Sequence, residues 1–147
     1  MIILYAEDDP EDFMLTKEAL EEAPLCNDLR RVEDGQELLD YLRREGPYDE
    51  DNAPWPVLIL LDLNMPRKGG RQAIQEIKAD PQLRHIPLVV LTTSRGEEEV
   101  FRSYELGASS FITKPVTFEG LVEAMKTLQR YWLKTVQLPE VKPEIHA

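Results

Sequence analysis

The sequence predicts an α/β protein in which helices cover both faces of one parallel β-sheet. Its 147 residues suit one compact domain. Three short segments, 2–6, 56–61 and 87–91, are apolar without any polar alternation, as expected for strands covered on both faces. Segments with helical periodicity separate them. This alternation predicts a three-layer, doubly wound sheet of five strands and five helices with right-handed crossovers.

The first expected strand runs directly into a cluster of carboxylates. Residues 7–12 carry five acidic side chains around one proline. Capping of a helix that begins at Pro10 explains Asp9, because aspartate accepts from free N–H groups and proline needs no partner there. Capping explains Glu7 and Asp8 less well, because both belong to the strand end. Crowded carboxylates repel one another unless a cation is present, so the cluster suggests a metal site.

The next elements follow from periodicity and from helix-breaking residues. We expect a helix over 10–23, a weaker strand at 28–33, and a second helix that opens at Gly35 and is ended by Gly46-Pro47. The acidic connection that follows is longer than usual and should form an exposed loop at one edge. Trp55 in this loop is interpreted as an anchor packed on the body, with a partner contact as the alternative.

The central strand ends in an aspartate. Six apolar residues, 56–61, lead into Asp62 without a polar interruption. Ligands bind at the carboxyl ends of strands in open α/β sheets, so Asp62 is a candidate site residue. The structural alternative is a helix-capping or solvated aspartate at the end of a strand.

The C-terminal half continues the alternation. Its expected elements are a helix after the turn at 67–70, the strand at 87–91, a helix from Ser94 to Gly107, a strand at 108–113 and a long helix capped by Thr117. Leu121, Met125, Leu128 and Trp132 form one apolar stripe on that last helix. The segment 134–147 has two prolines and little periodicity, so we expect an extended arm or a disordered tail after a domain at 1–133.

The polar residues at the strand ends match the needs of an acyl-phosphate site. Acids follow the first strand, Asp62 the third, the hydroxyl of Thr92 the fourth and Lys114 the fifth. An aspartate oxygen can attack a phosphoryl group, a hard divalent cation can offset its charge, and a lysine and a hydroxyl can bind its oxygens. Taken singly, Thr92 also suits a plain strand end and Lys114 a solvated charge.

Composition excludes several other classes of function. The formal net charge of −11 repels phosphates, so direct binding of nucleic acid is not expected. Cys26 is the only cysteine, which rules out an internal disulfide and a thiolate metal cluster. The apolar start has no basic leader and no apolar run reaches membrane-spanning length. We therefore expect a cytoplasmic protein without a membrane partner.

Four motifs together resemble the receiver domain of bacterial two-component response regulators over about residues 1–133. They are Glu7-Asp8-Asp9, Leu61-Asp62-Leu63-Asn64-Met65-Pro66, Leu91-Thr92-Thr93-Ser94 and Phe111-Ile112-Thr113-Lys114-Pro115. The resemblance implies a flavodoxin-like receiver fold with strand order 2-1-3-4-5. It also implies that a histidine kinase is the partner and that the chain catalyses only its own phosphorylation and dephosphorylation.

The same resemblance implies a role for each site residue. Asp62 would be the phosphoacceptor, and Thr92 and Lys114 would contact the phosphoryl group. Mg²⁺ would be held by Asp8, Asp62 and the backbone carbonyl of Asn64, with Glu7 acting through water. The Lys114–Pro115 bond would be cis. Phe111 would be the switch residue that turns inward when Thr92 moves toward the phosphate, with output through the face of the fourth helix, fifth strand and fifth helix.

The sequence departs from the family pattern at two positions and has a narrower resemblance as well. Gly69 stands where an acidic residue is common, and Thr93 is bulkier than usual. The long loop before Trp55 and the ending from Tyr131 onward are similar to single-domain regulators that partner phytochrome-type histidine kinases. Those proteins dimerise through the last helix and its extension. Because the adjacent apolar residues 131–133 cannot all face one core, we expect a homodimer here too.

Three other classes compete with this interpretation. A haloacid-dehalogenase-like phosphatase would need a second aspartate in place of Asn64 and a cap domain. A flavodoxin-like FMN binder would need a hydroxyl-rich or glycine-rich loop where residues 7–12 are acidic. A degenerate receiver that acts only as an interaction module is disfavoured because every acceptor-site residue is present.

Overall fold

One parallel sheet forms the centre of the molecule. The computed structural model describes residues 2–22, 28–62, 68–92, 110–113, 115 and 117–130. The strands are β1 (Ile2–Ala6), β2 (Asp28–Val32), β3 (Leu58–Leu61), β4 (Leu88–Thr92) and β5 (Ser110–Thr113). They pair in parallel in the order β2-β1-β3-β4-β5. The predicted fold class and strand order are confirmed.

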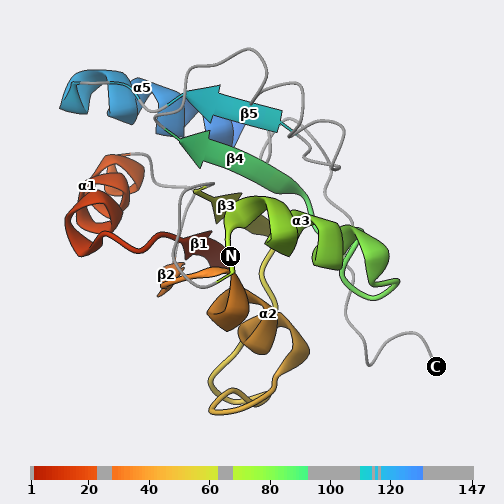
Figure 1. Ribbon diagram of the computed structural model, residues 1–147. Helices are drawn as coiled ribbons and strands as arrows, with labels where there is room; N and C mark the ends of the chain where they lie inside the picture. The colour runs from red at the N-terminus through yellow and green to blue at the C-terminus, as the bar shows by residue number, and fades with distance from the viewer. Residues whose placement is uncertain are drawn as a thin grey trace.

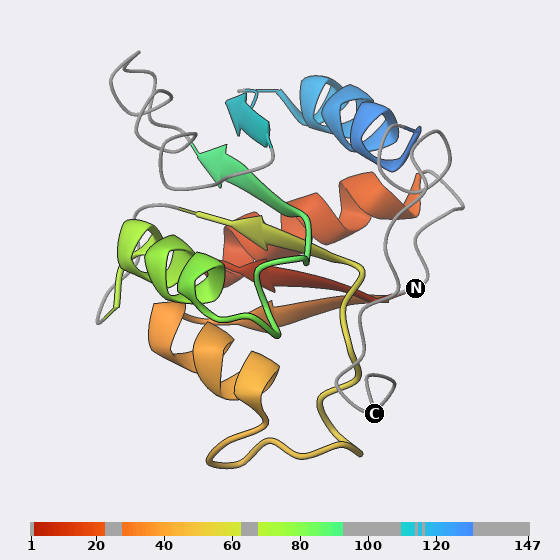
Figure 2. The ribbon, with the colours of Figure 1, turned by 90° about the vertical axis from the view of Figure 1, so that its right-hand side faces the viewer.

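Helices cover both faces of the sheet, as predicted. The described helices are α1 (Pro10–Glu21), α2 (Gly35–Arg43), α3 (Gly70–Ala79) and α5 (Phe118–Gln129). Helices α2 and α3 lie on one face, and α1 and α5 lie on the other (Figure 1). The arrowheads of the strands gather at one edge of the sheet (Figure 2). The helix expected from Ser94 to Gly107 lies outside the described residues.

Alternate residues of the central strands belong to two separate cores. In β1, Ile3 and Tyr5 pack toward α1 and α5, whereas Leu4 and Ala6 pack toward α2 and α3. The strands β3 and β4 divide in the same way. All these side chains are fully buried, which explains why the segments read as unbroken apolar runs.

The capping residues predicted at two helix starts do cap them. The Asp9 carboxylate accepts a hydrogen bond from the backbone N–H of Glu11 at 2.9 Å, and Pro10 is the first residue of α1. The Thr117 hydroxyl accepts from the N–H of Gly120 at 3.0 Å and starts α5. Both bonds satisfy donors that a helix start leaves free.

The end of α2 differs from the prediction. The helix ends at Arg43, before the expected Gly46-Pro47 stop, because Arg44 adopts the left-handed conformation with φ 54°. Its N–H still bonds to the carbonyl oxygens of Asp40 and Tyr41. A non-glycine residue seldom closes a helix in this way, so the sequence pattern pointed to the glycine instead.

The connection between α2 and β3 is held against the body of the protein. The Tyr41 hydroxyl donates to the carbonyl oxygen of Pro54 at 2.7 Å, and Arg44 Nε donates to that of Ala53 at 3.3 Å. The Arg44 guanidinium lies 6.0 Å from the centroid of the Trp55 ring, and Trp55 packs on the α2–α3 core. The interpretation of Trp55 as a loop anchor is confirmed. None of the described helices is both long and apolar enough to span a membrane.

Candidate acidic site at the carboxyl edge of the sheet

Two carboxylate residues follow neighbouring strands at the carboxyl edge. The backbone N–H of Asp62 donates to the carbonyl oxygen of Ala6 at 3.1 Å, which extends the β1–β3 ladder by one residue. Glu7 comes directly after Ala6. Its N–H donates to the carbonyl oxygen of Val32, the last residue of β2, at 3.0 Å. Asp62 is 8 % exposed and Glu7 is 1 % exposed. The sheet pairing therefore brings these two residues together in a mostly buried place.

The acidic stretch after β1 divides into residues with different surroundings. The Tyr5 hydroxyl donates to Glu7 Oε1 at 3.3 Å, so Glu7 is drawn toward the sheet. Asp8 is exposed at the edge. Asp9 caps α1, as the structural interpretation of that residue predicted. Glu7 and Asp8 are thus the members of the cluster that helix capping does not explain.

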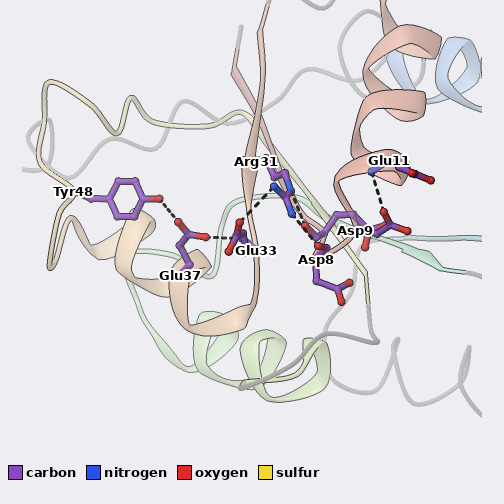
Figure 3. A network of polar contacts seen from close by, with 8 residues as sticks. Asp8, Asp9, Glu11, Arg31, Glu33, Glu37 and Tyr48 are labelled. Carbon is purple, nitrogen blue, oxygen red and sulfur yellow. Dashed lines mark hydrogen bonds and ion pairs between the residues drawn. The ribbon is translucent and has the colours of Figure 1, made fainter.

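An arginine from the neighbouring strand holds the backbone of this turn. Arg31 Nε donates to the carbonyl oxygen of Glu7 at 3.0 Å, and Arg31 Nη2 donates to that of Asp8 at 2.9 Å. A third nitrogen, Nη1, lies 3.5 Å from the Glu33 carboxylate (Figure 3). Sequence reasoning missed Arg31. The available signal was a cationic side chain near the end of a strand that pairs with β1, but that pairing is a property of the fold.

The start of α2 is bonded to the chain at Lys68, shortly before α3. The buried Asp34 caps α2 by accepting from the N–H of Glu37 at 2.8 Å. The N–H of Gly35 donates to the carbonyl oxygen of Lys68 at 2.9 Å. A Cβ atom on Gly35 would lie 2.4 Å from that oxygen, so only glycine fits here. Lys68 also forms an ion pair with Glu76 of α3 at 2.6 Å.

The remaining predicted site residues are placed in part. The backbone of Thr92 ends β4 opposite Thr113, and that of Phe111 lies in β5 opposite Val90. Their side chains fall outside the described residues, as do Asn64 and Lys114. The predicted cis bond between Lys114 and Pro115 lies outside them too, so it stays a prediction.

The donors at this edge suit a hard cation in their chemistry. Glu7, Asp8 and Asp62 offer only carboxylate oxygens, which Mg²⁺ and similar ions prefer. Within the part of the chain that is described, no three acidic, histidine or cysteine side chains already lie close enough together to hold an ion. The backbone thus places the donors at one edge, while their side chains are not drawn together around a centre.

Comparison with known proteins identifies the class of this doubly wound domain with an acidic carboxyl edge. The family model described as "Response regulator receiver domain" matches residues 3–126. The chain belongs to the response regulator receiver domain family.

Several relatives cover nearly the whole chain. Response regulator Rcp1 from Synechocystis sp. is 41% identical over 138 residues, 94% of this chain and 92% of Rcp1. The phosphorylated cyanobacterial phytochrome response regulator RcpA has a TM-score of 0.87 and 43% identity, covering 95% of this chain and 98% of RcpA. RPA3017, a response regulator in red light signaling of R. palustris, has a TM-score of 0.89 and 34% identity, covering 95% and 98%. Rcp1 has also been solved in an Mn²⁺-bound form, with a TM-score of 0.85 and 40% identity, covering 95% and 99%.

Proposed function

We propose that this protein is a single-domain response regulator that accepts a phosphoryl group from a histidine kinase on Asp62. The observation that carries the proposal is the position of Asp62, which directly follows the central strand and is bonded through its N–H to Ala6, next to the buried Glu7. Family membership supports it, and so does the phosphorylated state in which RcpA was solved. We also propose a cytoplasmic location.

The reaction needs a nucleophile and a means to stabilise the transferred group. A carboxylate oxygen of Asp62 forms the new P–O bond while the P–N bond of phosphohistidine breaks, and the released imidazole takes up a proton. Lys114 and Thr92 bind the phosphoryl oxygens in this proposal. Mg²⁺, held by Asp8, Asp62 and the carbonyl of Asn64 with Glu7 acting through water, would offset the negative charge. The Mn²⁺-bound form of Rcp1 supports a divalent ion at this site.

Phosphorylation would then shift the protein between two conformations. Thr92 moves toward the phosphoryl group and Phe111 turns inward, so the surface around the fourth helix, β5 and α5 changes. The backbones of Thr92 and Phe111 lie on the paired strands β4 and β5, which supports coupling between them.

Two relatives favour a phytochrome-type histidine kinase as partner. RcpA is a cyanobacterial phytochrome response regulator, and RPA3017 belongs to red light signaling.

We also propose a receiver domain at 1–133 followed by an arm at 134–147, with dimerisation through α5 and that arm. Sedimentation velocity of the full chain, with and without acetyl phosphate, tests the dimer. A monomer under both conditions would reject it.

Intact mass after incubation with acetyl phosphate and Mg²⁺ tests the central proposal. The wild-type chain should gain one phosphoryl group, and Asp62→Asn should gain none. Asp51→Asn is the matched control, because Asp51 is an exposed residue of the connection before β3 and undergoes the same chemical change. Chelation with EDTA should abolish the adduct in the wild type.

A missing adduct would call for phosphotransfer from a phosphorylated histidine kinase. If that donor also fails to label Asp62, the chain is an interaction module. If labelled protein releases phosphate through many cycles with a small phosphate ester, it is an aspartyl-phosphate phosphatase instead.

A further inference from the structure

We propose that Arg31 is a positioning residue that sets the acidic turn after β1 for binding a divalent cation. This inference rests on the proposed function, because it concerns the affinity of the same site. It assigns a role to a side chain whose hydrogen bonds go to the backbone of the acidic turn. Arg31 instead acts through the backbone of Glu7 and Asp8.

The geometry of the contact is bidentate. Two nitrogens of one planar guanidinium donate to the carbonyl oxygens of two consecutive residues, Glu7 at 3.0 Å and Asp8 at 2.9 Å. These two bonds fix the direction of both carbonyl groups, and so the direction in which the next side chain leaves the turn. Arginine can do this because its donors form a rigid fork, whereas lysine offers a single point of charge.

The surroundings of Arg31 keep its side chain in one place. Its side chain is 23% exposed, and Glu33 lies 3.5 Å away on the other side. The backbone N–H of Glu33 donates to Glu37 Oε1 at 2.6 Å, and the Tyr48 hydroxyl donates to Glu37 Oε2 at 2.7 Å. Figure 3 shows this row of contacts running from Tyr48 through Glu37, Glu33 and Arg31 to the acidic turn. The Glu33 carboxylate thus gives the guanidinium a third contact besides the two in the turn, and Glu37 holds the backbone of Glu33.

The charge of Arg31 and the geometry of its hydrogen bonds have opposite effects on the affinity for a cation. A guanidinium near the site repels an incoming cation, which lowers affinity, whereas a preset turn raises it. The carboxylate of Glu33 beside Arg31 offsets part of that positive charge, and solvent screens it further. The geometric effect should therefore dominate, as it does for residues that orient metal ligands from a second layer.

Two substitutions separate these effects. Arg31→Lys keeps the charge but loses the fork, and Arg31→Gln loses both. If the fork matters, both variants of the full chain bind Mn²⁺ about tenfold more weakly or worse than wild type. If only charge matters, Arg31→Lys binds as wild type does and Arg31→Gln binds more tightly. That second pattern would overturn the proposal.

Arg30 provides the matched control. It is the preceding residue of β2 and carries the same charge, but it bonds to Asp28 at 3.1 Å and to the carbonyl oxygen of Asn52 at 3.4 Å, away from the turn. Arg30→Lys and Arg30→Gln should leave the Mn²⁺ affinity within about twofold of wild type, since exposed charges are well screened. Equal losses in the Arg30 and Arg31 variants would also overturn the proposal.

The measurement is the electron paramagnetic resonance signal of free Mn²⁺ during titration of each variant. Urea unfolding in EDTA is recorded in parallel, because a purely structural role would lower stability without a selective loss of affinity. Asp62→Asn distinguishes a failure of the role of Arg31 from a failure of the proposed metal-dependent function. If wild type binds Mn²⁺, Asp62→Asn does not, and both Arg31 variants match wild type, only the role of Arg31 fails. If wild type itself binds no Mn²⁺, the metal-dependent function fails and this inference with it.

Discussion

The backbone N–H of Gly35 donates to the carbonyl oxygen of Lys68 at a distance of 2.9 Å, although the two residues lie at the starts of different helices. Gly35 is the first residue of α2, and Lys68 precedes α3 at the end of the segment that follows Asp62. This bond ties the chain at Lys68, six residues after the proposed phosphoacceptor Asp62, to the start of α2. The close approach exists only because position 35 has no side chain.

Gly35→Ala should therefore damage both stability and phosphorylation. The added Cβ would lie 2.4 Å from the Lys68 oxygen and 3.1 Å from its carbonyl carbon, which are backbone atoms that cannot rotate away. We expect a loss of about 1–3 kcal/mol in the free energy of urea unfolding. If Asp62 is the phosphoacceptor, as proposed, the rate of labelling by acetyl phosphate should fall as well, because the displacement of Lys68 would be transmitted along the chain to Asp62.

Gly46→Ala is the control for that variant. Gly46 has φ 62° but no atom within 4 Å of an added Cβ, so the substitution introduces strain without a clash. It should cost about 1 kcal/mol and leave the labelling rate unchanged. A normal labelling rate in Gly35→Ala would show that the bond to Lys68 does not position Asp62.

The stabilising effect of Tyr48 should depend on pH. Burial, then the hydrogen bond to Glu37 and the charge of that carboxylate, raise the pKa of Tyr48 above its usual 10.0. A phenol whose pKa is higher in the folded state stabilises the fold fully below pH 10.0, and this stabilisation is lost as the pH rises above that value. Tyr48→Phe should thus lower the free energy of unfolding by about 1 kcal/mol at neutral pH.

The difference between wild type and Tyr48→Phe should shrink above pH 10.0. Urea unfolding over a series of pH values measures it, and ultraviolet absorbance follows phenol ionisation in the same samples. A difference that stays constant into alkaline solution would mean that the hydrogen bond to Glu37 does not stabilise the folded state.

Two substitutions at Arg44 should separate backbone strain from side-chain contacts. Arg44→Ala loses the bond to Ala53 and the contact with Trp55 but keeps a left-handed residue with a Cβ atom. Arg44→Gly loses the same contacts and removes the strain. The glycine variant should be the more stable of the two by about 1 kcal/mol in urea unfolding. Equal stabilities would indicate that φ 54° is not strained at this position.

Thr117→Ala should loosen the start of α5. The variant loses the hydrogen bond from Gly120 to the Thr117 hydroxyl, which should cost about 1 kcal/mol of unfolding free energy. Thr117→Ser keeps the hydroxyl and should behave as wild type. Hydrogen exchange should show faster exchange at the N–H of Gly120 in Thr117→Ala alone. Equal exchange in the two variants would contradict the assigned cap.

Local patterns in the sequence predicted much of this fold. Apolar runs that end in a carboxylate placed Glu7 and Asp62 at strand ends, because burial on both faces excludes charge until the strand leaves the sheet. The caps at Asp9 and Thr117 were predictable since each depends on residues two or three positions away. The order of the strands came from the family resemblance.

Contacts that depend on tertiary pairing were not predictable in the same way. Arg31 meets Glu7 across 24 positions of sequence, and only the pairing of β1 with β2 brings them together. The bond between Tyr48 and Glu37 depends on the path of the connection after α2, which has no periodicity to read. The early end of α2 was missed because Arg44 adopts a conformation that sequence patterns assign to glycine.

The division of each central strand between two cores affects how β1 and β3 find the correct register during folding. Because both faces of β1 and β3 are apolar, sliding one strand by a single residue would still bury apolar side chains on each side. A slip of β3 toward its amino-terminal end would, however, draw Asp62 into the covered interior of the sheet, where an unpaired carboxylate is strongly unfavourable. Asp62 thus disfavours the slip that would move it inward, so a residue proposed to carry the chemistry also favours the correct alignment of β3 with β1.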